Sequence, residues 1–195
     1  MGELKKPQVV KNLFNTDLHE SLVSDLRLRF PNQGYYDVYF GRFLMGEDQS
    51  SVMQEAFNAS LETAREVFDS PTLLPSYALF AHYESRGGVI PSLIMHRDDN
   101  ACTYTLDMCV YQTEPWDLYV EGTPYTLYPN EALAYYGNDQ EHWRGDFPNP
   151  STQSVAMVFF HFVEPDHWFF TKGSDYVEVK QGRMTEEQWI TSHQK

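Results

Sequence analysis

The hydrophobic pattern of the chain changes at Tyr77, and this change restricts the folds that the chain can adopt. Before it, apolar residues recur at helical spacing over residues 18–30 and 50–68. After it, short segments rich in aromatic and β-branched residues alternate with turn residues, a pattern typical of strands. Helices followed by many short strands predict an α+β domain.

The predicted helices have recognisable ends. Asn15 is suited to cap the first helix, and Pro31 ends its apolar run. The second helix is expected to end at Asp69, because Ser70 and Pro71 follow it and the residue before a proline disfavours the helical conformation. A further helix is expected to begin near Thr185, and the sequence leaves open whether this segment packs on the domain or mediates self-association.

About eight strands are expected in the second part of the chain. They cover residues 77–83, 90–96, 101–111, 116–120, 125–128, 131–136, 141–144 and 153–163. A double-sheet jelly roll closes this many antiparallel strands. The 195 residues fit a single domain, with a helical part (about 1–72), a β core (about 77–165) and a C-terminal extension (166–195).

The charge and the cysteines limit the possible partners and compartment. A net charge of −14 argues against nucleic acid or an anionic membrane as partner, because such surfaces are bound by basic patches. Cys102 and Cys109 lie an odd number of positions apart in a predicted strand, so a disulfide between them is not expected. Free thiols, with no signal sequence or membrane span in evidence, predict a cytoplasmic location.

The sequence His96-Arg97-Asp98 and the distant His142 supply candidate metal ligands. Residues two apart on a strand point to the same face, so His96 and Asp98 can bind one ion from one side. A histidine from another strand then completes half an octahedron and leaves three positions open, as in the facial triad of non-heme Fe(II) oxygenases. We expect His161, which lies in an apolar strand, to be a core residue instead.

The chain resembles the iron(II)- and 2-oxoglutarate-dependent oxygenases, in particular the prolyl-4-hydroxylase-like branch. The resemblance covers roughly residues 8–165. It rests on the Asn12-Leu13-Phe14 entry, on Tyr83 and Gly87-Gly88 leading to His96 and Asp98, on Asn130-Glu131-Ala132-Leu133, and on His142-Trp143-Arg144 before the last strand.

The resemblance implies a double-stranded β-helix (a cupin-like jelly roll) with the N-terminal helices packed on one sheet. It also implies Fe(II), the co-substrate 2-oxoglutarate, and O2. The expected reaction is hydroxylation of an amino acid or a peptidyl side chain, with a small molecule or a peptide as substrate. Related halogenases lack the carboxylate ligand, so the presence of Asp98 favours hydroxylation over chlorination.

One departure from the family concerns the residue that binds the distal carboxylate of 2-oxoglutarate. The family usually places an arginine or lysine on the last strand, and residues 151–155 contain none. Arg144 is the candidate replacement, because it shares a strand face with His142 and can bind a carboxylate with two hydrogen bonds. The alternative is a surface ion pair with Glu141 or Asp146.

Further residues are candidates for the co-substrate site and its walls. Tyr83, Tyr104 and Gln153 could donate hydrogen bonds to the co-substrate. Aromatic side chains that could wall the pocket are Trp116, Trp143, Tyr135 and Tyr136. Two other functions stay open: a cupin-type metalloenzyme that does not use 2-oxoglutarate, and a jelly-roll binding module without catalysis. The oligomeric state is also open.

Overall fold

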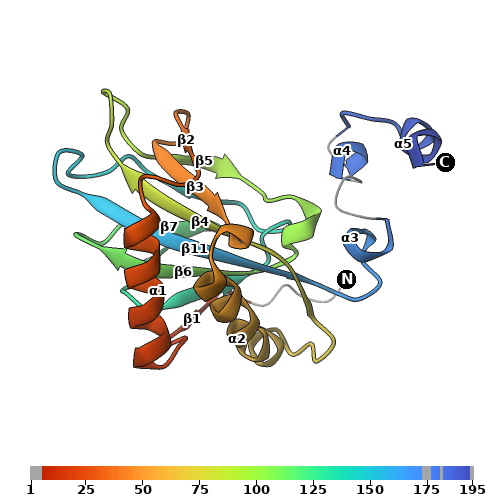
Figure 1. Cartoon of the computed structure of the whole chain (residues 1–195), viewed down its shortest axis with the longest axis horizontal. Helices are drawn as coiled ribbons and strands as arrows, with labels where there is room; N and C mark the ends of the chain where they lie inside the picture. Colours follow the sequence, from red (N-terminus) through yellow and green to blue (C-terminus); the bar gives the residue numbers. More distant parts are fainter. Residues whose placement is uncertain (1–5, 173–176, 181, 194–195) are drawn as a thin grey trace.

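The computed structural model describes residues 6–172, 177–180 and 182–193 (Figure 1). Its helices are α1 (Thr16–Arg29), α2 (Ser51–Phe68), α3 (Trp168–Thr171), α4 (Val177–Lys180) and α5 (Glu186–His193), with short 3-10 helices η1 (Glu47–Gln49) and η2 (Asn100–Cys102). The strands form two antiparallel sheets, which confirms the predicted combination of N-terminal helices and antiparallel strands.

The larger sheet has seven strands. In spatial order they are β1 (Gln8–Val10), β9 (Ala132–Tyr135), β6 (Tyr104–Gln112), β11 (Ser154–Val163), β4 (Leu74–Glu84), β3 (Arg42–Gly46) and β2 (Tyr35–Asp37). The smaller sheet has four strands, in the order β5 (Leu93–His96), β10 (His142–Arg144), β7 (Leu118–Val120) and β8 (Thr123–Tyr125).

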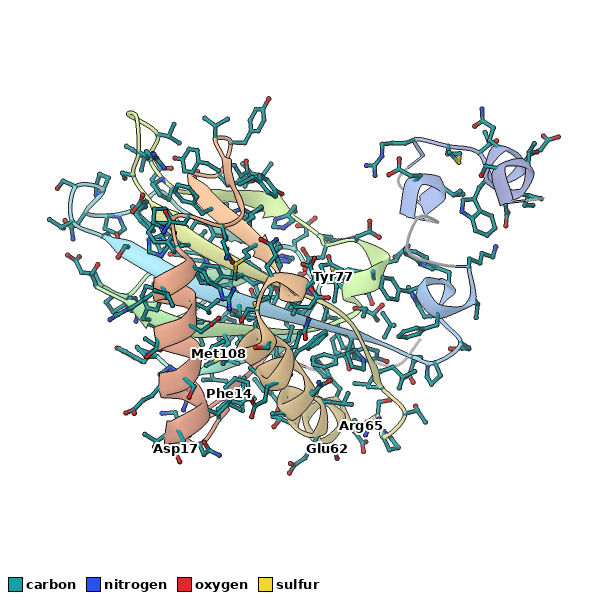
Figure 2. All side chains as sticks on the ribbon, viewed as in Figure 1. Phe14, Asp17, Glu62, Arg65, Tyr77 and Met108 are labelled. Carbon is teal, nitrogen blue, oxygen red and sulfur yellow. The ribbon has the colours of Figure 1, made fainter. Side chains whose placement is uncertain are left out.

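Helices α1 and α2 cover the outer face of the seven-stranded sheet, as Figure 1 shows. Phe14 and Met108, labelled in Figure 2, belong to the apolar core between these helices and the sheet, whereas Glu62 and Arg65 lie on the exposed side of α2. Leu22 has no exposed surface, and burying a leucine of this kind contributes about 2 kcal/mol.

The ends of both long helices agree with the sequence analysis. The side chain of Asn15 accepts a hydrogen bond from the backbone N–H of Leu18, as predicted for the cap of α1. Ser50 caps α2 in the same way through the N–H of Met53. Asp69 adopts the left-handed conformation after α2, which ends the helix where the sequence predicted.

The second core lies between the two sheets. It combines inward-facing residues of the larger sheet, such as Tyr83 and Met157, with Leu118 and Val120 of the smaller one. Trp116 seals one side of this core, and its indole N–H donates to the carbonyl of Gly145. Side chains do not fill all of the space between the two sheets, and the cavity that remains contains the site described below.

Two details of the fold differ from the prediction. The part up to residue 72 is not helical throughout, because β1, β2 and β3 extend the larger sheet on both edges. These strands are only three to five residues long, too short for a clear alternating pattern. Strict alternation along the predicted strand 101–111 places Tyr111 on the same face as Thr105 and Asp107. In the structure, β6 has an extra residue, Val110, opposite Ala156 and Met157 of β11, and this bulge turns Tyr111 to the helix-covered side.

The C-terminal extension contains α3, α4 and α5, and the expected helix near Thr185 is confirmed as α5. Figure 1 shows these helices beyond the end of β11. Across the described ranges of the chain, no helix is both long and apolar enough to cross a lipid bilayer.

Candidate metal centre

The three predicted metal ligands lie together on neighbouring strands of the smaller sheet. His96 ends β5 and His142 begins β10, and the two residues are direct cross-strand partners. Asp98 follows β5, and its backbone N–H donates to the carbonyl of Gly137 at 2.8 Å. The antiparallel register therefore brings the distant histidine to the His96-x-Asp98 segment, as the sequence predicted.

The ligand atoms of the triad converge. Nε2 of His96 lies 3.4 Å from Oδ1 of Asp98, and Nε2 of His142 lies 3.5 Å from the same oxygen. One ligand atom from each of the three side chains can be chosen so that all lie within 4.8 Å of one another. The rings of His96 and His142 are 4.2 Å apart between centroids. Three ligands on one side of a common point can hold an ion whose other coordination positions remain open.

Backbone carbonyls orient both imidazole rings. Nδ1 of His96 lies 2.8 Å from the carbonyl oxygen of Ile94, and Nδ1 of His142 lies 3.0 Å from that of Gln140. A carbonyl can only accept a hydrogen bond, so each Nδ1 carries a proton, and each Nε2 is the atom that faces Asp98 and would give its lone pair to a bound metal. This is the tautomer that a metal-binding histidine requires, and the donor set therefore fits a divalent ion.

The site is also electrostatically prepared for a cation. Burial alone would raise the pKa of Asp98, but hydrogen bonds with His142 and His96 outweigh this effect and hold the pKa well below its usual range. Burial alone would lower the pKa of His142, and the Asp98 carboxylate raises it instead. Asp98 is therefore an anion at neutral pH. A bound cation would stabilise this carboxylate in place of the hydrogen bonds with His142 and His96.

A glycine supports the carboxylate of Asp98 from behind. A Cβ atom on Gly137 would lie 2.6 Å from Oδ2 of Asp98, 2.6 Å from the carbonyl oxygen of Cys102 and 2.7 Å from Oγ1 of Thr105. Such distances are too short for any side chain, so only glycine lets the backbone approach Asp98 this closely. The chain after β9 thereby fixes the position of the carboxylate.

A cavity opens beside the triad, with a volume of about 200 Å³. Its size suits a small molecule, since drug-sized ligand sites begin at about 300 Å³. The residues that line it come from both sheets: Arg42, Tyr77, Leu79, Leu93, His96, Asp98, Asp107, Tyr135, His142, Phe159 and His161. Figure 2 labels Tyr77, which lies on β4 and whose hydroxyl is 2.9 Å from the sulfur of Cys102.

Asp107 is a buried carboxyl group in the wall of this cavity. The residue is only 4% exposed, and its Oδ2 accepts a hydrogen bond from the hydroxyl of Tyr135 at 3.1 Å. Oδ1 has no hydrogen-bond partner among the described residues. Burial raises the pKa of Asp107 to about 7, although the nearby His142 acts in the opposite direction.

His161 also faces the cavity and is not merely a core residue. Its ring packs against Tyr77, and its Nδ1 lies 3.2 Å from Oγ1 of Thr105. Burial lowers its pKa to about 4, so the imidazole is neutral at physiological pH. Together with Cys102 it forms a second group of metal-binding atoms around Asp98.

Arg144 is buried between the two sheets, against Trp116 and Met157 of the second core. It is 3% exposed, its Nη1 donates to the carbonyl of Trp116, and its Nη2 lies 3.8 Å from the sulfur of Met157. The predicted alternative, a surface ion pair with Glu141 or Asp146, is wrong because the side chain is buried. Arg144 does not line the cavity as it stands, but its charge acts on Asp107, which does.

The other predicted co-substrate residues do not line the cavity. Tyr104 faces the helix-covered side of the larger sheet, where its hydroxyl donates to Glu164. The side-chain amide of Gln153 donates to the carbonyl of Pro115 and so supports a loop. Tyr83 faces inward, but its hydroxyl accepts a hydrogen bond from Arg42. Of the four aromatic residues expected to wall the pocket, only Tyr135 does so.

Arg42, Asp107 and Tyr77 are cavity residues that the sequence analysis did not select. Asp107 carried a usable signal, because a carboxyl group at an inward position of a predicted strand needs a partner or a function. Arg42 carried none, since it lies on a short strand that the pattern did not predict.

Comparison with known proteins gives a consistent result at the level of fold. No protein-family model matches the sequence, and no curated protein is detectably similar to it. Solved structures with a similar fold include the non-heme α-ketoglutarate-dependent epimerase SnoN from nogalamycin biosynthesis (TM-score 0.66, 9% identity, covering 81% of this chain and 77% of SnoN).

Two further solved structures have the same kind of fold. HygX from Streptomyces hygroscopicus, solved with nickel and 2-oxoglutarate, has a TM-score of 0.63 at 11% identity, covering 82% of this chain and 83% of HygX. A prolyl-4-hydroxylase of Pseudomonas putida has a TM-score of 0.60 at 12% identity, covering 81% and 92%. These neighbours are thus an α-ketoglutarate-dependent epimerase, a protein solved with 2-oxoglutarate bound and a prolyl-4-hydroxylase, and at 9–12% identity they share the fold of this chain.

Proposed function

We propose that this protein is an Fe(II)- and 2-oxoglutarate-dependent oxygenase that hydroxylates an amino acid or a peptidyl side chain. The observation that carries the proposal is the convergence of His96, Asp98 and His142, with Nε2 of both histidines within 3.5 Å of one oxygen of Asp98. The fold shared with enzymes of this class supports it.

The strand order supports a double-stranded β-helix. From β4 to β11 the chain alternates between the two sheets, except at the hairpin of β7 and β8 within the smaller sheet, so that β4, β6, β9 and β11 lie in the larger sheet and β5, β7, β8 and β10 in the smaller. Such alternation in two facing antiparallel sheets is the arrangement of a jelly roll. In this proposal residues 1–195 form one oxygenase domain, with residues 166–195 as its extension.

In this proposal, separate residues of the chain bind the metal, orient its ligands and line the cavity. His96, Asp98 and His142 would hold Fe(II), which with 2-oxoglutarate and O2 supplies the oxidising power and leaves succinate and CO2 as by-products. The carbonyls of Ile94 and Gln140 keep the two rings oriented. Leu79, Leu93 and Phe159 give the cavity an apolar lining that excludes water from the reacting atoms.

Arg144 is the proposed partner of the distal carboxylate of 2-oxoglutarate. Its guanidinium contacts Met157 of β11, the strand on which the family usually carries this basic residue. The positive charge of Arg144 would therefore reach the region beside β11 from β10, which belongs to the facing sheet. Arginine has five N–H donors, and the contacts to Trp116 and Met157 leave others available for a carboxylate.

A cupin-type metalloenzyme without 2-oxoglutarate is the second candidate function. The observation in its favour is that the inward residues of β11, namely Val155, Met157, Phe159 and His161, include no arginine or lysine. Among the structural neighbours, the epimerase SnoN is a reminder that the same fold supports outcomes other than hydroxylation.

The test is an anaerobic titration of 2-oxoglutarate into the Fe(II)-loaded protein, followed by visible absorption. Chelation of the keto acid gives a weak charge-transfer band, which should form in the wild type and be absent in His142→Ala. Iron binding without a band would contradict the proposal and favour the 2-oxoglutarate-independent enzyme. Failure to bind iron would favour a binding module without catalysis.

A further inference from the structure

A second group of metal-binding side chains lies next to the triad and shares one residue with it. One ligand atom each from Asp98, Cys102 and His161 can be chosen so that all three lie within 4.8 Å of one another. Only Asp98 belongs to both groups. The second group combines a carboxylate, a thiol and an imidazole, and the proposed function uses neither Cys102 nor His161.

The loop that follows Asp98 holds Cys102 in a fixed place. Cys102 ends η2, and its backbone N–H donates to the carbonyl of Asp99 at 2.9 Å. The hydroxyl of Ser76 on β4 donates to the carbonyl of Ala101 at 2.7 Å, which ties η2 to the larger sheet. Cys102 is 2% exposed, so its thiol is enclosed by the protein.

His161 belongs to a polar row on the inner face of the larger sheet. Its cross-strand partners are Tyr77 on β4 and Thr105 on β6. The hydroxyl of Thr105 donates its one proton to the carbonyl of Cys102 at 3.2 Å. It can therefore only accept from Nδ1 of His161, which lies 3.2 Å away, so Nδ1 carries a proton. Nε2 of His161 is then the atom that can give its lone pair to a metal.

The carboxylate of Asp98 has one oxygen for each group. Oδ1 is the oxygen that lies within 3.5 Å of both triad histidines. A Cβ atom on Gly137 would lie within 2.7 Å of Oδ2 of Asp98, of the carbonyl oxygen of Cys102 and of Oγ1 of Thr105. Oδ2 therefore lies on the side of Cys102 and Thr105. A carboxylate with its two oxygens on different sides can bridge two ions, which in two-metal sites lie about 3.5–4 Å apart.

Tyr77, labelled in Figure 2, completes the surroundings of the thiol. Its hydroxyl lies 2.9 Å from Sγ of Cys102, and its ring is 4.7 Å from that of His161 between centroids. When the sulfur is a metal-bound thiolate, this hydroxyl can donate to it, and such outer contacts orient metal ligands. Tyr77, Asp98 and His161 also line the cavity, which gives an ion a path to the group.

We propose that Asp98, Cys102 and His161 form a second metal site, which takes Zn(II) or an ion of similar chemistry and shares the Asp98 carboxylate with the triad. Thiolate, imidazole and carboxylate are the ligands of zinc in proteins, and three of them leave one tetrahedral position open. Mg(II), Ca(II) and Mn(II) prefer oxygen ligands, so the thiol selects against them. This site goes beyond the proposed function and does not depend on 2-oxoglutarate.

The test is an anaerobic titration of Co(II), a spectroscopic substitute for Zn(II), into the reduced, metal-free protein. A Co(II)–thiolate bond gives a near-ultraviolet charge-transfer band that imidazole and carboxylate ligands do not give. The wild type should bind two Co(II) ions per chain by equilibrium dialysis and develop this band. An equal concentration of Zn(II) should remove the band, whereas Mn(II), which binds such ligands more weakly than Co(II), should leave it.

Three variants assign the ligands. Cys102→Ser should lower the number of bound ions from two to one and remove the band. Cys109→Ser is the matched control, because Cys109 is also buried but lies in the core between the sheets, and this variant should keep both ions. His142→Ala removes a ligand of the triad alone, so it should bind one ion and keep the band. The chain has only two cysteines, so a band that persists in Cys109→Ser identifies Cys102 even if Cys102→Ser does not fold.

Absence of the thiolate band in the wild type would overturn the assignment, whatever the number of bound ions. So would a band that survives Cys102→Ser, or one that is lost in Cys109→Ser or His142→Ala. A band with a single bound ion in the wild type would place Cys102 at the triad itself and would overturn a separate site. Two bound ions and the band in a protein that gives no 2-oxoglutarate signal would contradict the proposed function and leave the second metal site intact.

Discussion

His142 is the direct cross-strand partner of His96, and this pairing between β10 and β5 places both imidazoles within 3.5 Å of a single oxygen of Asp98. The site therefore depends on strand register. A shift of one residue in this pairing would turn His142 and Arg144 to the other face of the smaller sheet together. The metal ligands and the proposed carboxylate partner are in this sense one structural unit.

Removal of the carboxylate ligand should abolish tight metal binding. Asp98→Ala takes away the oxygen on which both histidines converge, and we expect the Kd for Fe(II) or Mn(II) to rise by at least about 100-fold. Metal titration followed by calorimetry measures this change. Glu141→Gln, next to His142 but exposed, is the control and should bind metal normally. Unchanged affinity in Asp98→Ala would remove this residue from the site.

A methyl group on Gly137 should disturb the same carboxylate indirectly. The added carbon would lie within 2.7 Å of Asp98, Cys102 and Thr105, so Gly137→Ala should weaken metal binding about 10–100-fold and lower stability by about 1–3 kcal/mol. Gly145→Ala is the matched control, because a Cβ atom at that position would meet nothing within 4 Å. Equal metal affinities of the two variants would show that Gly137 does not position Asp98.

Much of the fold could be predicted because its signals are local. The cap at Asn15 and the long apolar strands depend on nearby residues in the sequence, and both helices lie where the pattern predicts them. The short edge strands β2 and β3 are different, because β3 forms by pairing with β4, and β2 by pairing with β3. Since this pairing joins segments far apart in the chain, no local pattern places Arg42 at the cavity.

The candidate site likewise combines residues that local patterns identify with residues that only the folded chain brings together. The spacing of His96 and Asp98 could be recognised, and the convergence of His142 followed from the expected order of strands. The co-substrate residues were less predictable. The alternation of a strand indicates which face of the sheet a side chain occupies, but not whether it reaches the cavity. Tyr104 lies on the outer face, where it bonds to Glu164, and Gln153 supports a loop. The bulge in β6 adds a change of face that no periodicity indicates.

The buried carboxyl of Asp107 should make stability depend on pH. Burial raises its pKa from 3.8 to about 7 in the folded protein. Between these values the folded state holds a proton that the unfolded chain has lost, so stability falls as pH rises through this window and reaches a plateau above it. The full difference corresponds to about 4 kcal/mol.

Asp107→Asn removes this dependence, because an amide does not ionise. We expect the stability of Asp107→Asn minus that of the wild type to increase from about pH 4 to about pH 7 and then remain constant. Urea unfolding of the metal-free proteins over this range measures the difference. Parallel pH profiles for the two proteins would show that the carboxyl titrates normally in the folded state.

The assignment of Arg144 to the distal carboxylate of 2-oxoglutarate can be tested with a shortened keto acid, with Arg42 of the cavity wall as the comparison. 2-Oxopentanoate binds a metal as 2-oxoglutarate does but lacks the distal carboxylate. Arg144→Met should raise the Kd for 2-oxoglutarate by about 10–100-fold, the value of a charge-assisted hydrogen bond or two, and leave that for 2-oxopentanoate unchanged. Arg42→Met, the comparison variant, should leave both constants unchanged, since the proposed function assigns the distal carboxylate to Arg144 and not to Arg42. The charge-transfer band of the Fe(II) protein reports each titration, and thermal melting checks that both variants fold. If Arg42→Met loses affinity for 2-oxoglutarate while Arg144→Met keeps it, the roles are exchanged: the anchor then lies on β3, and Arg144 serves to hold Trp116 and Met157 in the core.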